Sequence, residues 1–357
     1  MAKKLYIPGP VEVSFDVLQA MAAPMIGHRM KEYAELHSRV TRALKALLNS
    51  SDPVFLSTSS AFGVMEGAVR NLVQKRCANF SNGAFSAKWH DVTLRCGLAA
   101  DHFAAEWGSP VTPEMVDAAL ATGKYDAMTL VHNETSTGVM NPLAEIAVVM
   151  KKYPEVSFIV DTVSSMSAVP LDVTALGTDV CLAGVQKAFG LPPGLAVFAV
   201  SARALEKAAT TPNRGYYFDF LEFAANDLKD NTPSTPCISL IYALDHQLQK
   251  MAGEGLEQRY ARHQAMAEAT RSWIVDQGFG LFAADGYRSV TLTSGADDGR
   301  TDLEKLKKLA GLEGYAIDNG YGKIKNRTFR IPHMADMVQA DLDELFDLLE
   351  QLLPRVR

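Results

Sequence analysis

A lysine and an aspartate stand at positions where charged side chains are uncommon, and both could take part in chemistry. Lys187 follows the mostly apolar run 179–185 and precedes the turn sequence 191–194. A lysine in such a place can lose part of its hydration, and a desolvated amine is a nucleophile. Asp161 ends the apolar run 156–160, which is typical of a buried parallel strand, so its carboxylate lies at the carboxyl edge of the sheet. The sequence therefore predicts an amine and a carboxylate at one sheet edge.

An amine beside a carboxylate suits the cofactor pyridoxal phosphate. The aldehyde of this cofactor bonds a lysine, and its pyridine nitrogen needs an acid that keeps it protonated, so that the ring can withdraw electrons. Each residue also has an ordinary alternative. A lysine near a strand end is often solvated, and an aspartate that ends a strand often caps the next helix. The cofactor hypothesis therefore depends on further matches along the chain.

The composition narrows the classes of function. A chain of 357 residues with 48% hydrophobic residues can bury a large core and form two domains. The net charge of −6 carries no basic block, so we expect small metabolites and no nucleic acid as partners. No apolar run is long enough for export or a membrane span. The four cysteines lack metal-type spacing, so we expect no metal site and a reducing cytoplasm as the location.

Helical and strand patterns alternate through the first 200 residues. Apolar residues at helical spacing predict helices at 33–49, 62–75, 85–97, 113–121 and 142–152. Apolar runs predict strands at 54–56, 78–80, 126–131, 156–160, 179–183 and 195–200. This alternation predicts an α/β fold with a mostly parallel, doubly wound sheet.

The second part of the chain predicts a smaller α+β domain. A loop-rich stretch at 207–236 precedes one long linking helix at about 238–276. Strands are expected near 280–283, 287–293 and 328–331, followed by a closing helix at 339–353. We therefore expect a large domain at 16–245 and a small domain formed by 1–15 and 246–357.

With Lys187 and Asp161 placed, the chain resembles class V of the fold-type I pyridoxal-phosphate enzymes, the group of alanine–glyoxylate, serine–glyoxylate, serine–pyruvate and phosphoserine aminotransferases. Short motifs carry this resemblance, and they follow one another in the family's order over nearly the whole chain. They lie at 8–10, 26–29, 57–67, 82–85, 132–138, 161–163, 186–187, 231–233 and 330–334. Any one motif is weak evidence, whereas the ordered set is strong.

The resemblance implies cofactor-binding roles for several residues in addition to the anchoring Lys187 and the pyridine partner Asp161. Ser59, Ser60 and Ala61 would hold the phosphate at a helix N-terminus, although the family usually has glycine at positions 59 and 61. Phe85 would stack on the pyridine ring where relatives often carry tryptophan. The remaining cofactor contacts would come from Thr135, at the ring oxygen, and from Val163, Gln186, Asn231 and Thr232. Without the resemblance, Ser59 is a helix cap, Phe85 a core residue and Thr135 part of a polar turn.

The resemblance also implies substrate-binding residues and a subunit arrangement. Arg330 would hold the substrate carboxylate with its two-pronged guanidinium, and Gly9, His28 and Arg29 would line the substrate site. Asn231 and Thr232 match a pair that reaches the cofactor phosphate of the neighbouring subunit in phosphoserine-aminotransferase-like relatives. This match implies a homodimer with shared active sites.

The implied activity is a ping-pong transamination between a small amino acid, alanine or serine, and a 2-oxo acid such as glyoxylate or pyruvate. Phosphoserine aminotransferase, which uses phosphoserine and 2-oxoglutarate, is a nearly even alternative because His28 and Arg29 also resemble a phosphate-binding pair of those enzymes. A class V lyase or desulfurase is disfavoured, because Gln186 stands where desulfurases have histidine and no cysteine follows Cys237. A non-catalytic scaffold is disfavoured because Lys187, Asp161 and Arg330 are all present.

Overall fold

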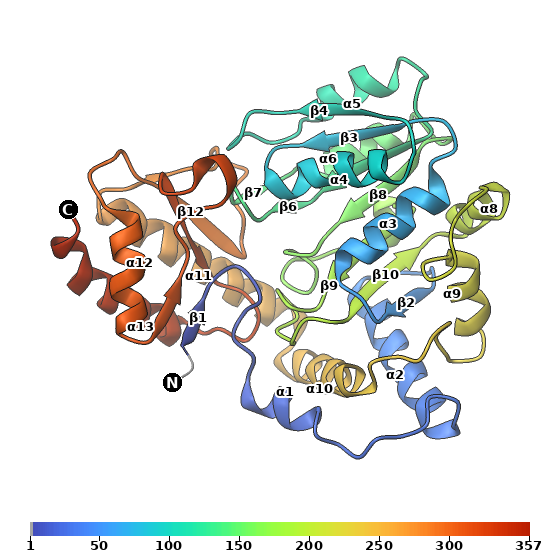
Figure 1. The fold of residues 1–357 in the computed structure, drawn as a ribbon, viewed down its shortest axis with the longest axis horizontal. Coiled ribbons are helices and arrows are strands. Elements are labelled where there is room, and N and C mark those ends of the chain that lie inside the picture. Colours follow the sequence, from blue (N-terminus) through green and yellow to red (C-terminus); the bar gives the residue numbers. More distant parts are fainter. Residues whose placement is uncertain (1–2) are drawn as a thin grey trace.

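A seven-stranded sheet forms the centre of the larger part of the molecule (Figure 1). The structure, a computed structural model, describes residues 3–357. The strand order is β2 (Val54–Ser57), β10 (Ala196–Val200), β9 (Val180–Gly184), β8 (Ser157–Asp161), β5 (Ala127–Val131), β3 (Cys77–Ser81) and β4 (Ala100–Ala104). β10 pairs antiparallel with both of its neighbours, and the other pairs are parallel. The predicted mostly parallel α/β sheet is confirmed.

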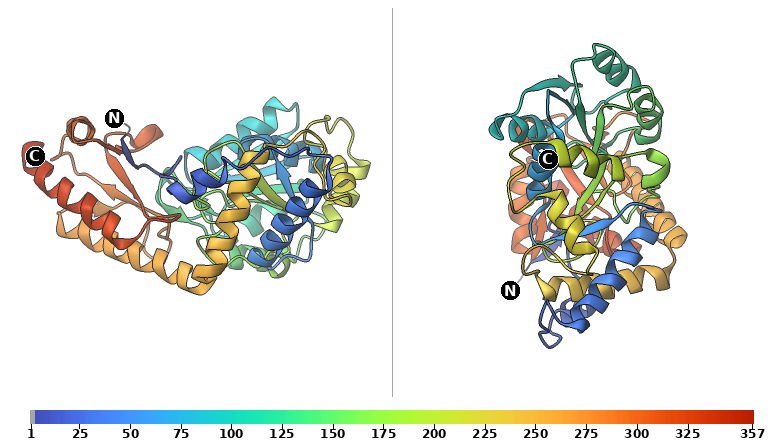
Figure 2. Two further views of the ribbon diagram at one scale, coloured as in Figure 1. Left: turned by 90° about the horizontal axis from the view of Figure 1, so that it is seen from below. Right: turned by 90° about the vertical axis from the view of Figure 1, so that its right-hand side faces the viewer.

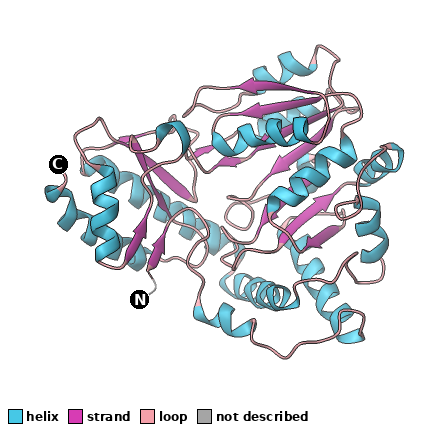
Figure 3. Ribbon diagram, viewed as in Figure 1, coloured by secondary structure: helices cyan, strands magenta, loops and turns pink. Residues whose placement is uncertain are grey.

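Helices cover both faces of this sheet (Figure 3), which explains why its central strands are apolar on both sides. Along β8, Phe158 and Val160 point into one core and Ile159 into the other. The first core is completed by α2 (Lys31–Leu47), α5 (Pro113–Leu120), α6 (Leu143–Met150) and α10 (Ile238–Glu254). The second is completed by α3 (Ala61–Leu72), α4 (Ala84–Arg95), α8 (Ala202–Thr210) and α9 (Phe220–Asp227).

A smaller α+β unit lies beside the large sheet (Figure 1). Its antiparallel sheet has the order β11 (Gly280–Leu281), β12 (Leu292–Ala296) and β14 (Thr328–Pro332). The N-terminal β1 (Lys4–Tyr6) pairs in parallel with β13 (Tyr315–Ile317) of this unit. These strands share an apolar core with α11 (Leu256–Asp276), α12 (Leu303–Leu312) and α13 (Gln339–Leu352). We keep the boundaries 16–245, and 1–15 with 246–357, as a proposal that the β1–β13 pairing supports.

Several predicted elements were wrong in their bounds. The single helix at 238–276 is two helices, α10 and α11, set at an angle in Figure 2. They are separated by Gly255, whose φ of 86° is left-handed and breaks the helix. The strand expected at 287–293 is β12, which begins only at Leu292. The loop-rich stretch 207–236 holds the end of α8 and all of α9.

Some short elements were not predicted. β1, β4, β13 and α12 were missed, because their residues are partly exposed and lack the long apolar runs of the central strands. The remaining elements are α1 (Phe15–Ala20), β6 (Asn133–Glu134), β7 (Val139–Met140), α7 (Val173–Leu176), and the 3₁₀ turns η1 (Gly322–Ile324) and η2 (Leu353–Arg355). Within residues 3–357, none of the helices has both the length and the apolar character that crossing a membrane requires.

Candidate active site

Lys187 lies in the turn that follows β9, at the carboxyl edge of the large sheet. Its amine donates hydrogen bonds to Thr135 Oγ1 at 2.6 Å and Ser164 Oγ at 3.0 Å. Burial lowers the pKa of this amine from 10.5 to about 8, against the opposing charge of Asp161. Two hydroxyl groups therefore hold an amine that loses its proton far more easily than an exposed lysine does.

Gly9 packs directly against the stem of this lysine. A Cβ atom at position 9 would lie 2.9 Å from Lys187 Cγ, which is closer than carbon atoms approach. The φ of Gly9 is +125°, a conformation that side-chain-bearing residues rarely adopt. Gly9 therefore lies beside Lys187, and its role in substrate binding stays a prediction.

Asp161 is the last residue of β8, as predicted, and its carboxylate is 7% exposed. It accepts hydrogen bonds from the backbone N–H of Val163 at 2.9 Å and from Trp89 Nε1 at 3.4 Å. Burial raises the pKa of Asp161 to about 6, although the N–H of Val163 and the charge of Lys187 favour its ionised form. Val163 thus touches the site through its backbone, which orients the carboxylate.

Phe85 lies in the first turn of α4, the helix that follows β3. Its ring centroid lies 5.1 Å from Lys187 Nζ and stacks at 5.0 Å on the ring of Tyr321 from the small domain. The buried carboxylate of Glu134 fixes the start of this helix, because it accepts hydrogen bonds from the backbone N–H groups of Phe85 and Ser86 at 3.3 and 2.7 Å. The aromatic ring is therefore held beside the amine by a rigid, hydrogen-bonded turn.

The segment Ser59, Ser60 and Ala61 lies between β2 and α3, as predicted. Ser60 occupies the N-cap position of α3, but its hydroxyl makes no capping hydrogen bond. The N–H of Gly63 donates to the backbone oxygen of Ser60 at 3.0 Å, whereas those of Ala61 and Phe62 have no partner within residues 3–357 and are open to a bound anion. The side chain of Ser59 instead bonds Ser57 Oγ at 2.9 Å. The amine of Lys88 lies 5.2 Å from the ring centroid of Phe62 in the first turn of α3, and it adds positive charge at this end.

Arg330 on β14 reaches the site from the small domain. Its side chain is 6% exposed, and its Nη1 donates to the backbone oxygen of Thr135 at 2.9 Å. Thr135 therefore contacts both Arg330 and Lys187, which brings the predicted substrate-binding arginine and the predicted anchor lysine into one site. Asp318 accepts the other contacts of the guanidinium, from Nε at 2.8 Å and from Nη2 at 2.6 Å.

Gln186 precedes the lysine but makes no side-chain hydrogen bond within residues 3–357. Its carboxamide folds over Gly184, where an added Cβ would lie 2.5 Å from Gln186 Oε1. Its backbone oxygen accepts from the N–H of Val11 at 3.1 Å. The phosphate contact implied for Gln186 therefore stays a prediction.

Four predicted residues are not brought to the Lys187 cluster within one chain. His28 and Arg29 lie in the segment between α1 and α2, at the edge of the molecule in Figure 1, and Arg29 Nε donates to His28 Nε2 at 3.3 Å. Asn231 and Thr232 lie between α9 and α10, where Asn231 Oδ1 accepts from the N–H of Thr232 at 2.8 Å. Roles for these four residues at an active site require a second subunit and stay predictions.

Sequence reasoning missed several residues that surround the cluster: Lys88, Trp89, Glu134, Ser164, Asp318 and Tyr321. Ser164 could have been found, because it directly follows the motif 161–163. Asp318 and Tyr321 carried no signal, since they belong to a polar loop whose contact with the large domain depends on the folded arrangement.

The donor set fits pyridoxal phosphate. Open N–H groups at the start of α3, with Lys88 nearby, suit a phosphate. A half-buried amine, a buried carboxylate and an aromatic ring suit the aldehyde, the pyridine nitrogen and the ring face. These three groups lie on different secondary-structure elements and are brought together only by the fold.

Comparisons with known proteins agree with this geometry. The family model described as aminotransferase class-V matches residues 17–282. An uncharacterized aminotransferase of Methanocaldococcus jannaschii is 37% identical over 340 residues, which cover 93% of this chain and 88% of that protein. Serine–glyoxylate aminotransferase of Methylorubrum extorquens is 31% identical over 355 residues, with 95% and 88% covered.

Comparison with solved structures leads to the same family. The crystal structure of alanine–glyoxylate aminotransferase from Nostoc sp. superposes with a TM-score of 0.93 at 27% identity and covers 99% of this chain and 95% of that one. Fold and sequence thus point to the same group of enzymes. The chain belongs to the class V aminotransferase family, and it is a transaminase of the pyridoxal-phosphate-dependent group.

Proposed function

We propose that this enzyme transfers the amino group of a small amino acid, alanine or serine, to a 2-oxo acid such as glyoxylate or pyruvate, with pyridoxal 5′-phosphate as cofactor. The observation that carries the proposal is that Lys187 and Arg330 both contact Thr135, while the buried carboxylate of Asp161 lies close enough to Lys187 for its charge to affect the pKa of the amine. The similarity to serine–glyoxylate and alanine–glyoxylate aminotransferases supports the choice of small substrates.

The cofactor would supply an aldehyde that bonds amines and a ring that withdraws electrons from the bonded carbon. Lys187 would anchor the aldehyde and, once released by the amino donor, move a proton to and from the substrate Cα. Thr135 and Ser164 hold its amine in place for both tasks.

The other residues would bind and orient. Asp161 would keep a proton on the pyridine nitrogen, and Phe85 would hold the plane of the ring. Arg330 would bind the substrate carboxylate, which turns the Cα–H bond towards Lys187. Ser59, Ser60, Ala61 and the N-terminus of α3 would hold the phosphate, joined by Gln186, with Gly9 leaving room beside the lysine.

We also propose that the enzyme works as a homodimer whose subunits complete one another's sites. Large apolar side chains on α1 and the segment after it point to solvent, with Phe15 72%, Met25 68% and Met30 53% exposed. An exposed patch of this kind marks a contact surface. His28 and Arg29 lie in this segment, so a partner that covers it would receive them, while Asn231 and Thr232 would reach the phosphate. The four cysteines form no disulfide, which fits a location in the cytoplasm.

The lowered pKa of Lys187 gives a pH prediction. A neutral amine attacks an aldehyde and a protonated amine does not, so attachment of the cofactor to the apoprotein requires loss of the proton from Lys187. Because burial lowers its pKa to about 8, the attachment rate should rise about ten-fold per pH unit below pH 8 and level off above it. Stopped-flow absorbance between pH 6 and 10 measures this rate. A rate that still rises ten-fold between pH 9 and 10 contradicts the prediction, because that is the behaviour of an exposed lysine.

Substrate choice is tested with the cofactor-loaded enzyme and single amino donors. L-alanine, L-serine, L-phosphoserine and L-glutamate are added separately, and loss of the visible absorption band of the cofactor is followed over time. We expect alanine or serine to give a kcat/KM at least about ten-fold above that for phosphoserine, a difference of about 1.4 kcal/mol. A clear preference for phosphoserine would instead assign the chain to the phosphoserine branch and overturn the proposed substrate class.

A further inference from the structure

Within residues 3–357, two of the donors on the Arg330 guanidinium have no hydrogen-bond partner. A guanidinium carries five N–H groups in a fixed plane. Asp318 accepts two of them, at Nε and Nη2, and the oxygen of Thr135 accepts a third at Nη1. One N–H remains on each of the two terminal nitrogens, Nη1 and Nη2. These two donors are enough for one carboxylate group and leave none for a second.

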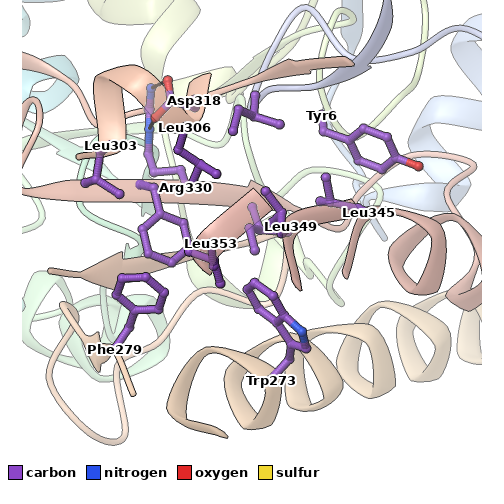
Figure 4. A pocket seen from close by; sticks show the side chains of 13 residues that line it. Tyr6, Trp273, Phe279, Leu303, Leu306, Asp318, Arg330, Leu345, Leu349 and Leu353 are labelled. Carbon is purple, nitrogen blue, oxygen red and sulfur yellow. Dashed lines mark hydrogen bonds and ion pairs between the residues drawn. The ribbon is translucent and has the colours of Figure 1, made fainter. Parts of the chain in front are cut away.

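Asp318 is itself held in place and does not act as a loose counterion. Its Oδ1 also accepts from the backbone N–H of Gly320 at 2.8 Å, and the side chains of Arg330 and Asp318 are only 6% and 14% exposed. Figure 4 shows the two side chains together at one end of the small-domain core. There they border a cavity of about 10 Å³ that is otherwise lined by apolar side chains and by Tyr6 and Trp273. Low polarity on this side strengthens the pair and keeps the guanidinium plane fixed.

The carboxylate of Asp318 also neutralises the positive charge of Arg330. The amine of Lys88 lies 5.2, 5.1 and 5.9 Å from the ring centroids of Phe62, Phe85 and Tyr321, so it stands between the first turn of α3 and the Tyr321 loop. A substrate carboxylate bound to Arg330 would meet one positive charge that already faces one negative charge. A second negative group on the substrate side chain, placed near Asp318, would be repelled by this fixed carboxylate.

We propose that Asp318 is a positioning and specificity-determining residue: it orients Arg330 for one carboxylate and selects amino donors whose side chains carry no negative charge. This inference rests on the proposed function, because it assigns Arg330 to the substrate carboxylate. It narrows the substrate class to neutral amino acids. The same loop presents Tyr321, whose ring lies 5.6 Å from the Arg330 guanidinium, so the Asp318–Arg330 pair also fixes the base of the loop that covers Phe85.

The test compares Asp318→Asn with Asp298→Asn. The control makes the same substitution in the same domain, at an ion pair with Arg300 whose two side chains are 70% and 59% exposed. For each enzyme, kcat/KM is measured with L-alanine and L-aspartate as donors. Calorimetry also gives the Kd of propionate and succinate, which carry one and two carboxylates and cannot react.

The expected result is a loss of selectivity in Asp318→Asn. The ratio of kcat/KM for alanine over aspartate should fall about ten-fold, and the affinity of propionate relative to succinate should fall by a similar factor. Asp298→Asn should leave both ratios unchanged. Equal losses for both donors in Asp318→Asn, or unchanged ratios, would show a merely structural role and overturn the proposal.

A second variant covers the case in which Asp318→Asn does not fold. Asp318→Glu keeps the charge, so it should preserve the preference for alanine while KM rises. Loss of the preference in this variant also overturns the proposal. Binding of propionate and succinate separates this inference from the proposed function, because neither compound has to react. If no donor reacts with the wild-type enzyme, the proposed function fails. The affinities for propionate and succinate still report on the role of Asp318.

Discussion

Replacement of Lys187 by alanine should lower kcat/KM by a factor on the order of 10⁵, because one amine would both anchor the cofactor and move the proton at Cα. Within residues 3–357, no other lysine is held by Thr135 and Ser164, the two hydroxyl groups that position this amine. Loss of the amine should leave the fold intact, since its side chain is only partly buried. Transamination assays and circular dichroism of the same preparation measure the two effects separately.

Two variants serve as controls for this result. Lys151→Ala changes an exposed lysine at the end of α6 and should retain wild-type activity. Lys187→Arg keeps the positive charge but not the nucleophilic amine, and it should be as inactive as the alanine variant. Activity of Lys187→Ala within about ten-fold of wild type would rule out the assigned role.

Replacement of Asp161 by asparagine should lower kcat by about 10²–10³, the usual cost of losing one group aimed at developing charge. The asparagine would keep the shape and the hydrogen bond from Val163 but not the negative charge that holds a proton on the pyridine nitrogen. Asp161→Glu keeps the charge and should recover part of the activity. Steady-state kinetics with saturating cofactor measure kcat in each variant.

The pKa of Asp161 predicts how cofactor binding changes with pH. Burial raises the pKa of the carboxyl group to about 6, so the ionised form is lost as the pH falls through this value. Binding of the cofactor by the wild-type enzyme should therefore weaken below pH 6, and binding by Asp161→Asn should lack this dependence. An asparagine variant with wild-type kcat and the same pH profile would contradict the role of Asp161.

The sequence predicted the large sheet well, and for a clear physical reason. Strands such as β8 and β9 are buried on both faces, so they appear as mostly apolar runs with polar residues at or soon after their ends. Asp161 and Lys187 stand just after such runs, which made both the sheet edge and its two reactive groups visible. The small domain was predicted less well, because β1 and β13 are three-residue strands with partly exposed side chains.

The partners of the predicted residues were harder to find. Asp318 precedes Arg330 by twelve residues and lies in a polar loop, so only the folded β14 shows that the two side chains pair. In the sequence, Glu134 looked like part of a polar turn. In the structure it is fully buried, and its carboxylate accepts hydrogen bonds from the start of α4. Contacts of this kind depend on elements far apart in the sequence.

The most direct test of the central claim identifies the lysine that carries the cofactor. The purified protein is incubated with pyridoxal 5′-phosphate, reduced with borohydride, digested and analysed by mass spectrometry. The expected result is a phosphopyridoxyl group on the peptide that contains Lys187, and on no other peptide at one equivalent of cofactor. A label on a different lysine, or an unlabelled Lys187 peptide in a protein that binds the cofactor, would contradict the proposed active site.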